Sequence, residues 1–257
     1  MKTLNNNFEK YFPKENTIVM LHAHADDESF LSAGIINEFI MRNYSILLIY
    51  LATSLVVGEE KTSIRQKELF QALELLGVKN VEFLKYCEPK YAENGKPLHQ
   101  QAIQEVSDEI KRVIQKKGIK NYILFSYDKN GGYGNKDHLI VHKAGRLLFK
   151  NSPTLRSLFE VTIPREIYLD WFSKKEGENS KKYLPKLNYW STEFGLEKKE
   201  INYLYSLNFI QVDKKRNALS KHESQIKKDE FPLALRDNDF QKLFGKEYFV
   251  CVGRSLV

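Results

Sequence analysis

Apolar segments alternate with helical patterns over the first 150 residues, and this alternation constrains the fold more than any other feature of the sequence. Thr17–Ala23 and Ser45–Ala52 are rich in Ile, Leu and Val without polar alternation, which is typical of buried parallel strands. Two more strands are expected, at Val81–Tyr86 and Tyr122–Tyr127. Helical patterns lie between them, the first an apolar stripe from Phe30 to Ile40. A second helix is expected near Thr62–Leu76, ended by Gly77, and a third near Gln101–Lys117, ended by Gly118.

This βαβαβαβ order predicts an α/β fold. We expect a Rossmann-like, mostly parallel sheet of strand order 3-2-1-4-5, covered by helices on both faces. A chain of 257 residues that is 42% hydrophobic can bury one sizeable core, so a single domain is expected over residues 1–257. Its core would be residues 15–150, and a smaller C-terminal appendage, 151–257, would supply the substrate pocket and the last elements.

The pattern weakens after residue 150. We expect a strand at Val161–Leu169, a charged loop at Lys174–Pro185, a helix at Lys215–Lys227 and a last strand at Tyr248–Gly253. The stretch Val161–Leu196 contains Trp171, Tyr183, Tyr189 and Trp190 among many lysines. These aromatic residues could stack on a sugar in the wall of a pocket, or could be the core and surface of the appendage.

Two polar loops follow the first and fourth predicted strands. The first is LHAHADDES (Leu21–Ser29), and the second runs from Ser126 to His142. In a sheet of this order, ligands bind where the connections leave strands 1 and 4 in opposite directions, beyond the carboxyl ends of the strands. The two loops are therefore expected to meet in one crevice, although about a hundred residues separate them.

Together the loops offer His24, Asp26, Asp27 and His138 as metal ligands or bases. Adjacent carboxylates repel one another, so the acidic cluster needs open water or a positive partner. Two His and one Asp would suffice for a catalytic zinc, leaving the other Asp to take a proton from water. Alternatively, the acids simply cap a helix N-terminus, which is the favoured interpretation for Asp26 or Glu28 alone.

Four segments resemble motifs of the LmbE/PIG-L family of zinc-dependent N-acetylglucosamine deacetylases. AHADDE (Ala23–Glu28) is similar to the family's AHPDDE, and GGYGNKDH (Gly131–His138) to its GGYGHPDH. IRQKELFQALELLGV (Ile64–Val78) resembles its R-x-x-E-L…LGV helix, and KRNALSKHESQ (Lys215–Gln225) its late K-x-x-A-L-x-x-H-x-S-Q segment. The motifs most resemble those of the branch that deacetylates glucosaminyl-inositol thiol precursors, with its related amidases.

The resemblance implies roles for individual residues. His24, Asp27 and His138 would hold one Zn²⁺ per chain, although such a ligand set also accepts iron, cobalt or manganese. Asp26 would be the general base, Tyr133 would stabilise the oxyanion, and Asp137 matches the acid of the second motif. Arg65 would lie near the substrate; a salt bridge to Glu68 or Glu59 is an equally good interpretation of that residue.

The sequence departs from the family pattern in the second motif, where Asn135 replaces a histidine and Lys136 a proline. An asparagine can donate a hydrogen bond but cannot deliver a proton. The leaving amine would then be protonated by Asp26 or by another acid such as His22 or His142, or the chain has kept the metal only as a binding protein. Of the other histidines, a half-buried role is expected for His22, His222 is either structural or catalytic, and His99 has no sequence context.

We therefore expect a hydrolase that removes an N-acyl group, most simply acetyl, from an amino sugar or a related small-molecule conjugate. The alternative is a metal-retaining binding or accessory protein whose catalysis is weakened by Asn135. A net charge of +7 comes from scattered lysines, which disfavours nucleic acid as a partner. With no apolar run of membrane-span length, no signal-peptide pattern and only two distant cysteines, a cytoplasmic location is expected. The oligomeric state, a homo-oligomer included, is left open.

Overall fold

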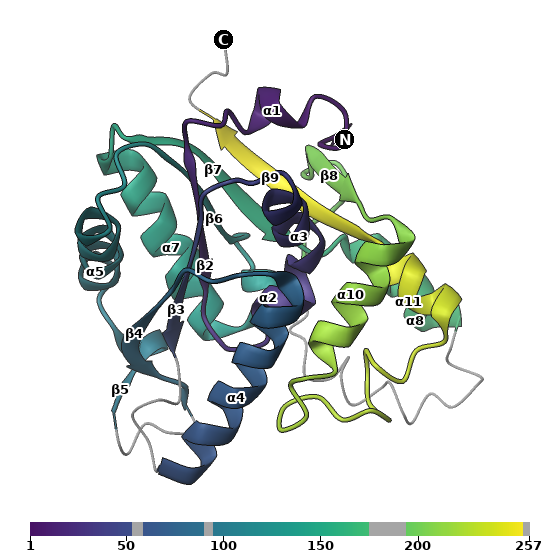
Figure 1. Cartoon of the computed structure of the whole chain (residues 1–257). Coiled ribbons are helices and arrows are strands. Elements are labelled where there is room, and N and C mark those ends of the chain that lie inside the picture. Colours follow the sequence, from purple (N-terminus) through teal and green to yellow (C-terminus); the bar gives the residue numbers. More distant parts are fainter. Residues whose placement is uncertain (53–58, 90–94, 175–193, 254–257) are drawn as a thin grey trace.

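The structure is a computed structural model that describes residues 1–52, 59–89, 95–174 and 194–253 (Figure 1). Within these residues nine strands form one sheet in the order β1-β8-β9-β7-β6-β2-β3-β4-β5. The strands are β1 (Lys2–Thr3), β2 (Thr17–His22), β3 (Ile46–Ala52), β4 (Val81–Cys87), β5 (Lys96–Pro97), β6 (Tyr122–Tyr127), β7 (Leu155–Thr162), β8 (Tyr203–Ser206) and β9 (Lys246–Gly253).

The five central strands confirm the predicted parallel order. Counted along the chain as strands 1 to 5, β2, β3, β4, β6 and β7 lie in the order 3-2-1-4-5, and every neighbouring pair among them is parallel. The buried residues of β2 and β3 pair in register from Ile18 with Ile46 to His22 with Tyr50. The connections thus leave β2 and β6 in opposite directions, and the carboxyl ends of these two strands bound the crevice.

The C-terminal half extends the same sheet past β7. β9 runs antiparallel to both β7 and β8, and β1 pairs with the far side of β8. The strand expected at Val161–Leu169 is placed too late, because β7 ends at Thr162 and a helix begins at Arg165, one residue after Pro164. Proline cannot continue a strand ladder and is well suited to the start of a helix.

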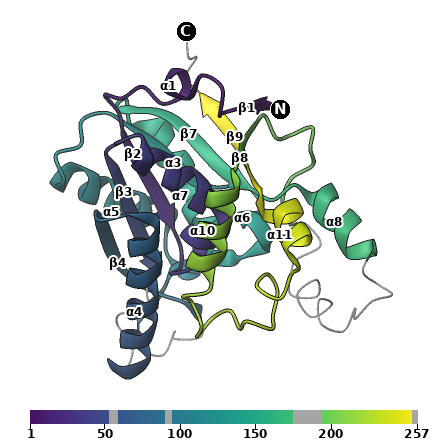
Figure 2. The same cartoon turned by 45° about the vertical axis from the view of Figure 1, so that its right-hand side comes forward.

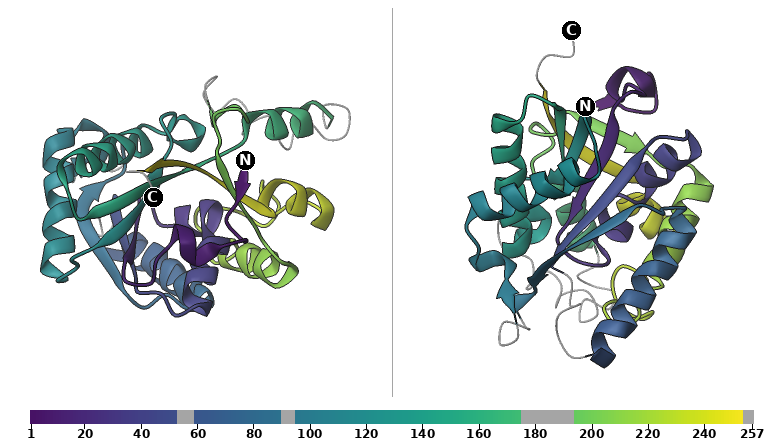
Figure 3. Two further views of the ribbon diagram at one scale, coloured as in Figure 1. Left: turned by 90° about the horizontal axis from the view of Figure 1, so that it is seen from above. Right: turned by 60° about the vertical axis from the view of Figure 1, so that its left-hand side comes forward.

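Helices cover both faces of the sheet, as expected (Figures 1 and 3). α5 and α7 pack together on one face, while α3, α4 and α10 pack on the other; Figure 2 shows α4 and α10 side by side. The helices are α1 (Phe8–Tyr11), α2 (Asp27–Leu31), α3 (Ala33–Met41), α4 (Glu59–Leu76), the 3₁₀ helix η3 (Leu98–Gln100), α5 (Ile103–Lys116), α6 (Gly131–Gly134), α7 (Lys136–Asn151), α8 (Arg165–Lys174), α10 (Phe209–Leu219) and α11 (Asp237–Phe244).

The apolar stripe from Phe30 to Ile40 is divided between two helices that break at Ser32. Two backbone N–H groups in the first turn of α3, on Gly34 and Ile35, each donate to the Glu247 carboxylate at 2.8 Å. A carboxylate at this position satisfies unpaired donors and meets the positive end of the helix dipole. Because Glu247 comes from β9, the break could not be foreseen from local sequence.

The helix expected at Lys215–Lys227 is also misplaced. α10 begins after Asn208, whose side chain and that of Gln211 form a reciprocal capping box, and it ends at Leu219. The capping signal was present in the sequence as N-x-x-Q. Beyond Leu219 the chain turns inward, which buries His222 against α2.

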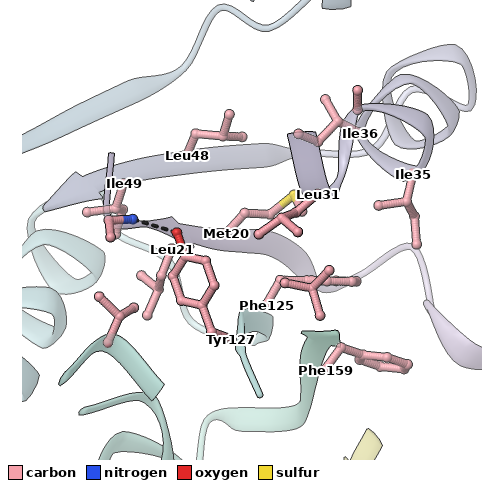
Figure 4. Close-up of a cluster of buried hydrophobic side chains, with 14 of the residues drawn as sticks. Met20, Leu21, Leu31, Ile35, Ile36, Leu48, Ile49, Phe125, Tyr127 and Phe159 are labelled. Carbon is pink, nitrogen blue, oxygen red and sulfur yellow. Dashed lines mark hydrogen bonds between the residues drawn. The ribbon is translucent and has the colours of Figure 1, made fainter. Parts of the chain in front are cut away.

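The core lies between the sheet and its helices, and Figure 4 shows one cluster of its side chains. Met20, Leu48 and Phe125 are 2% exposed or less, and they pack with Leu31, Ile35 and Ile36 from α2 and α3. No helix in the described ranges is long and apolar enough to cross a membrane.

Candidate active site

Three side chains from the two polar loops converge at the carboxyl ends of β2 and β6. His24 and Asp27 come from the loop after β2, and His138 comes from the first turn of α7. Each offers one ligand atom, and these atoms lie within 4.8 Å of one another. All three residues are buried, with 7% exposure or less. The structure thus brings together the two segments that the strand order predicted to meet.

Protein partners occupy the outward-facing atoms of all three side chains. His24 Nε2 is 2.9 Å from Asp137 Oδ2, and His138 Nδ1 is 3.1 Å from the Gly131 carbonyl. Asp27 Oδ2 accepts hydrogen bonds from the Tyr127 hydroxyl at 2.6 Å and from the His24 backbone N–H at 2.8 Å.

The other ring nitrogen of each histidine and the other carboxylate oxygen of Asp27 face one another. His138 Nε2 is 3.3 Å from both His24 Nδ1 and Asp27 Oδ1. Such outer partners fix the tautomer and orientation of metal-binding histidines in proteins. Two imidazole nitrogens and one carboxylate oxygen are donors that suit zinc, so the three residues fit a divalent ion with an open position.

The surrounding charges support the same interpretation. Burial alone would raise the pKa of Asp27, but His138, His24 and the Tyr127 hydrogen bond outweigh it and lower the pKa below its ordinary value. Burial opposes protonation of His24, but the hydrogen bond between its ring and the Asp137 carboxylate, together with the charges of Asp27 and Asp137, raises the pKa of that imidazole. Asp27 is therefore held as a carboxylate, the form that binds a metal.

Asp26 lies beside the three ligands in an unusual backbone conformation. Its φ of 134° is rare for a residue with a side chain, and its backbone N–H donates to Glu28 Oε2 at 3.1 Å. Burial and the neighbouring Asp27 raise the pKa of the Asp26 carboxyl to about 6. A carboxylate of this pKa can both accept and return a proton near neutral pH.

Glu28, the third acid of the cluster, is a fully buried hydrogen-bond hub. Its carboxylate lies 2.9 Å from His222 Nε2 and accepts hydrogen bonds from the Ser29 and Tyr50 hydroxyls at 2.6 and 3.0 Å. Burial opposes ionisation, but His222 lowers the pKa of Glu28 to about 2. Glu28 also accepts the backbone N–H of Asp26 at the start of α2, so the helix-cap interpretation describes one of its contacts but not the others.

The glycine-rich loop of the second motif wraps around His138. Gly131, Gly132 and Gly134 have φ angles of 60°, 69° and 84°, which favour glycine. A Cβ on Gly131 would lie 3.0 Å from His138 Cβ, so the close approach also requires glycine. Tyr133, between these glycines, places its ring edge-on against the His138 ring, with the centroids 5.1 Å apart.

A cavity of about 450 Å³ opens beside Asp26 and His24. Four of the other predicted site residues also line it, namely Arg65, Tyr133, Asn135 and Asp137, as does Lys136. The complete lining is His24, Asp26, Arg65, Glu88, Pro89, Tyr133, Gly134, Asn135, Lys136, Asp137 and Gln225. The other two predicted ligands, Asp27 and His138, lie deeper, behind this surface.

Arg65 forms an ion pair with Glu88 and donates to the Ala25 carbonyl at 3.2 Å. Glu68, one of its two suggested partners, instead accepts the backbone N–H and hydroxyl of Ser224. The side chain of Glu59, the other suggested partner, lies outside the described residues. Glu88 is thus a pocket residue that sequence reasoning missed, although it directly follows the carboxyl end of β4, where ligands are expected.

Tyr127 was also missed as a site residue. It is the last residue of β6, and its ring stacks on His138 with the centroids 3.9 Å apart, while its hydroxyl bonds Asp27. Figure 4 shows this tyrosine among the core side chains. Its position at the carboxyl end of strand 4 was the available signal.

His22 and His142, the two histidines suggested as alternative acids, both have protein partners. His22 is 3% exposed, more deeply buried than expected, and its Nε2 lies 3.2 Å from Ser32 Oγ; burial lowers its pKa. His142 Nδ1 lies 2.9 Å from the Tyr127 carbonyl and 3.0 Å from Glu160 Oε1. Neither His22 nor His142 belongs to the described residues that line the cavity.

Of the aromatic residues suggested as a pocket wall, Trp171 is 2% exposed and donates to Asp239 at 2.7 Å on α11. It is therefore a packing residue of the C-terminal half. Tyr183, Tyr189 and Trp190 lie outside the described residues, as does most of the loop expected at Lys174–Pro185.

Comparisons with known proteins follow the same segments. The model of the family described as "PIG-L: GlcNAc-PI de-N-acetylase" matches residues 19–149, which include both polar loops. A mycothiol S-conjugate amidase of Streptomyces coelicolor is 25% identical over 154 residues, a match that spans about half of each protein (52%). A 1D-myo-inositol 2-acetamido-2-deoxy-alpha-D-glucopyranoside deacetylase of Acidothermus cellulolyticus is 21% identical over 91% of this chain and 88% of its own.

Solved structures share the fold at lower identity. A teicoplanin deacetylase superposes with a TM-score of 0.61 at 13% identity, covering 93% of this chain and 99% of its own. An N,N'-diacetylchitobiose deacetylase from Pyrococcus horikoshii gives 0.56 at 15% identity, covering 97% and 90%. A 4-carboxy-2-hydroxymuconate hydratase also superposes, at 0.52, covering 94% and 98% with 13% identity. The fold alone therefore does not determine the reaction, and the side chains of the site must.

Proposed function

The chain belongs to the PIG-L family of GlcNAc-PI de-N-acetylases, and on that basis we propose that it is a metal-dependent hydrolase of N-acylated amino sugars. The substrate would be an N-acetylated amino sugar or a related conjugate, and the products a free amine and the carboxylic acid. The names of the relatives, inositol-linked acetamido-sugar deacetylases and a mycothiol conjugate amidase, support this substrate class.

One observation carries the proposal: the ligand atoms of His24, Asp27 and His138 converge beside the cavity that His24 and Asp26 line. We propose that these three residues hold one divalent ion per chain, which we take to be Zn²⁺. When bound, the ion would supply a Lewis acid for the acyl carbonyl and would make a water molecule more acidic.

The side chains around the cavity would move the protons. Asp26 would take a proton from the attacking water as its oxygen bonds the acyl carbon. Tyr133 and the Asn135 amide would donate hydrogen bonds to the oxygen that gains negative charge. When the C–N bond breaks, Asp26 would return the proton to the leaving amine, so no additional acid is needed at Asn135.

The polar groups at the other side of the cavity would bind the sugar. Arg65 and Glu88 line it as an ion pair, and this pair could bind hydroxyl groups through both charges. Asp137 would act through His24, whose Nε2 it contacts, and not on the substrate directly.

The test is a deacetylation assay over a panel of N-acetylated amino sugars, with Asp26→Asn as the decisive variant. The exchange keeps size and polarity but removes the base, so turnover should fall by about 10²–10⁴-fold. Metal content, measured by elemental analysis of the same preparation, should stay at the wild-type level. Retained turnover in Asp26→Asn would contradict the role of Asp26, and wild-type protein inactive on the whole panel with its metal bound would contradict the substrate class.

A further inference from the structure

The two carboxylate oxygens of Asp137 have different surroundings. Oδ2 lies 2.9 Å from His24 Nε2, whereas Oδ1 is buried and has no hydrogen-bond partner among the described residues. Asp137 as a whole is 1% exposed, so water is largely excluded from it. A buried polar oxygen without a hydrogen-bond partner costs free energy, so the nearest group that could donate to it is a candidate partner.

The polar group that faces Oδ1 is the imidazole of His99. His99 Nδ1 lies 3.6 Å from Asp137 Oδ1, and this ring nitrogen is also buried without a hydrogen-bond partner in the described part of the chain. The distance exceeds that of a hydrogen bond, so the two atoms face each other across a short gap. A small rotation of either side chain would close it.

The backbone around His99 holds the ring at this position. His99 is the central residue of η3, which packs against α7, the helix that begins with Asp137 and His138 in its first turn. The preceding residue, Leu98, is fully buried and anchors η3 in the core. The His99 side chain is 20% exposed, so one edge of the ring faces outward while Nδ1 faces Asp137.

We propose that His99 is a positioning residue that donates from Nδ1 to Asp137 Oδ1 and thereby holds the metal ligand His24. With both oxygens engaged, the Asp137 carboxylate cannot rotate, and His24 keeps Nδ1 directed at His138 and Asp27. The proposal rests on the proposed function to the extent that the three ligands bind a metal. It adds a partner from η3, a segment for which the sequence had suggested no role.

The test measures Zn²⁺ affinity of purified, metal-free protein by competition with a chromophoric chelator. His99→Ala should weaken Zn²⁺ binding by about tenfold, the lower end of the effect of losing an outer-shell partner. His99→Asn should stay close to wild type, because its amide nitrogen lies where Nδ1 lies. His99→Gln, whose amide nitrogen lies near the position of Nε2, should behave like His99→Ala. Lys96→Ala, an exposed position on the neighbouring β5, is the matched control.

Thermal unfolding of the metal-free variants separates positioning from packing. If His99→Ala lowers the melting temperature but leaves Zn²⁺ affinity unchanged, His99 is structural and the proposal is wrong. Failure of His99→Asn to restore affinity, when His99→Ala has lost it, would also overturn it. Asp27→Ala tests the assumption that His24, Asp27 and His138 bind a metal. If that variant binds Zn²⁺ like wild type, the metal site is misassigned, and so is the proposed function.

Discussion

The Asn135 side-chain oxygen caps α7 by accepting the backbone N–H of Asp137 at 2.8 Å. It also lies 3.4 Å from the backbone nitrogen of His138, so the asparagine fixes the first turn of the helix that carries a proposed metal ligand. With the oxygen committed to the helix, the amide NH₂ is the end of the side chain that remains for the cavity, which Asn135 lines. The asparagine that stands in place of the family motif's histidine therefore caps the helix that carries His138.

This cap predicts the effect of changing Asn135. Asn135→Ala should lower the free energy of unfolding by about 1 kcal/mol, whereas Asn135→Asp, which retains a capping oxygen, should be nearly neutral. Chemical denaturation of both variants checks this. An equal loss in Asn135→Asp would show that the cap is not the source of the effect.

Asn135→His tests the alternative function. If the chain is a hydrolase adapted to asparagine, the histidine variant should be less stable and no faster than wild type in the deacetylation assay. A large gain in turnover at unchanged stability would instead mark the natural protein as catalytically impaired, which would favour a metal-retaining binding protein.

Asp27→Ala should abolish metal binding. The carboxylate supplies one of three proposed ligands and also binds Tyr127 and the His24 backbone, so its loss removes a ligand and loosens a second one. Elemental analysis should find about one ion per wild-type chain, in keeping with a single three-ligand site, and little in the variant. Asp26→Asn, in which the neighbouring carboxylate is neutralised, is the control and should retain the ion.

The pair of His222 and Glu28 should make stability depend on pH. Burial opposes protonation of His222, but Glu28 outweighs it and raises the pKa of the imidazole above 6.5. Glu28 has its pKa lowered to about 2, so it is ionised at every pH considered. A histidine of raised pKa contributes stability that is fully present below the unfolded pKa of about 6.5 and is lost as pH rises through the folded pKa.

His222→Gln should therefore cost about 3 kcal/mol of unfolding free energy near pH 5.5 and distinctly less near pH 9. Urea denaturation at both pH values, with a chelator present, measures the difference. Glu223→Gln, an exposed change next to His222, should show no such pH dependence. A penalty for His222→Gln that is the same at both pH values would mean that His222 acts by packing alone.

Gly195 should be intolerant of any side chain. Its φ is +55°, and a Cβ would lie 2.1 Å from the Ile163 carbonyl oxygen. Its backbone N–H donates to the Gly132 carbonyl, and its own carbonyl accepts from Asn130 at 2.8 Å, so this residue ties the glycine-rich loop to the segment that follows residue 193.

Gly195→Ala should destabilise the protein by about 3 kcal/mol and lower kcat through displacement of Tyr133. Gly118→Ala is a matched control: its φ is also positive, at +68°, but its Cβ would meet open space. The control should lose only about 1 kcal/mol, the backbone cost of a left-handed alanine. Equal losses in the two variants would show that the clash with Ile163 is relieved without cost.

The sequence predicted the parts of this molecule that depend on local pattern and on strand order. Buried runs such as Thr17–Ala23 placed the central strands, and helix-ending Gly77 and Gly118, with φ of 81° and 68°, ended α4 and α5 as expected. From the order 3-2-1-4-5 it followed that His24 and His138 would meet.

The parts that could not be predicted depend on contacts between distant segments. The break at Ser32 needs Glu247 from β9, and the inward turn after Leu219 needs Glu28 as the partner of His222. His99 is separated from Asp137 by 38 positions, and only the packing of η3 on α7 brings them together. No periodicity or capping signal reports such relationships, because each is created by tertiary packing.

Of the strands that the structure describes, β9 comes last in sequence, and it occupies an interior position between β7 and β8. During synthesis, the edge of β7 therefore stays unpaired until β9 has been made, and β8 and β1 have no place in the sheet before then. A nascent chain that already contains every proposed metal ligand still exposes an unpaired strand edge, which is a template for aggregation. Synthesis of β9, and not assembly of the crevice, would then set the moment at which the edges of β7 and β8 are covered.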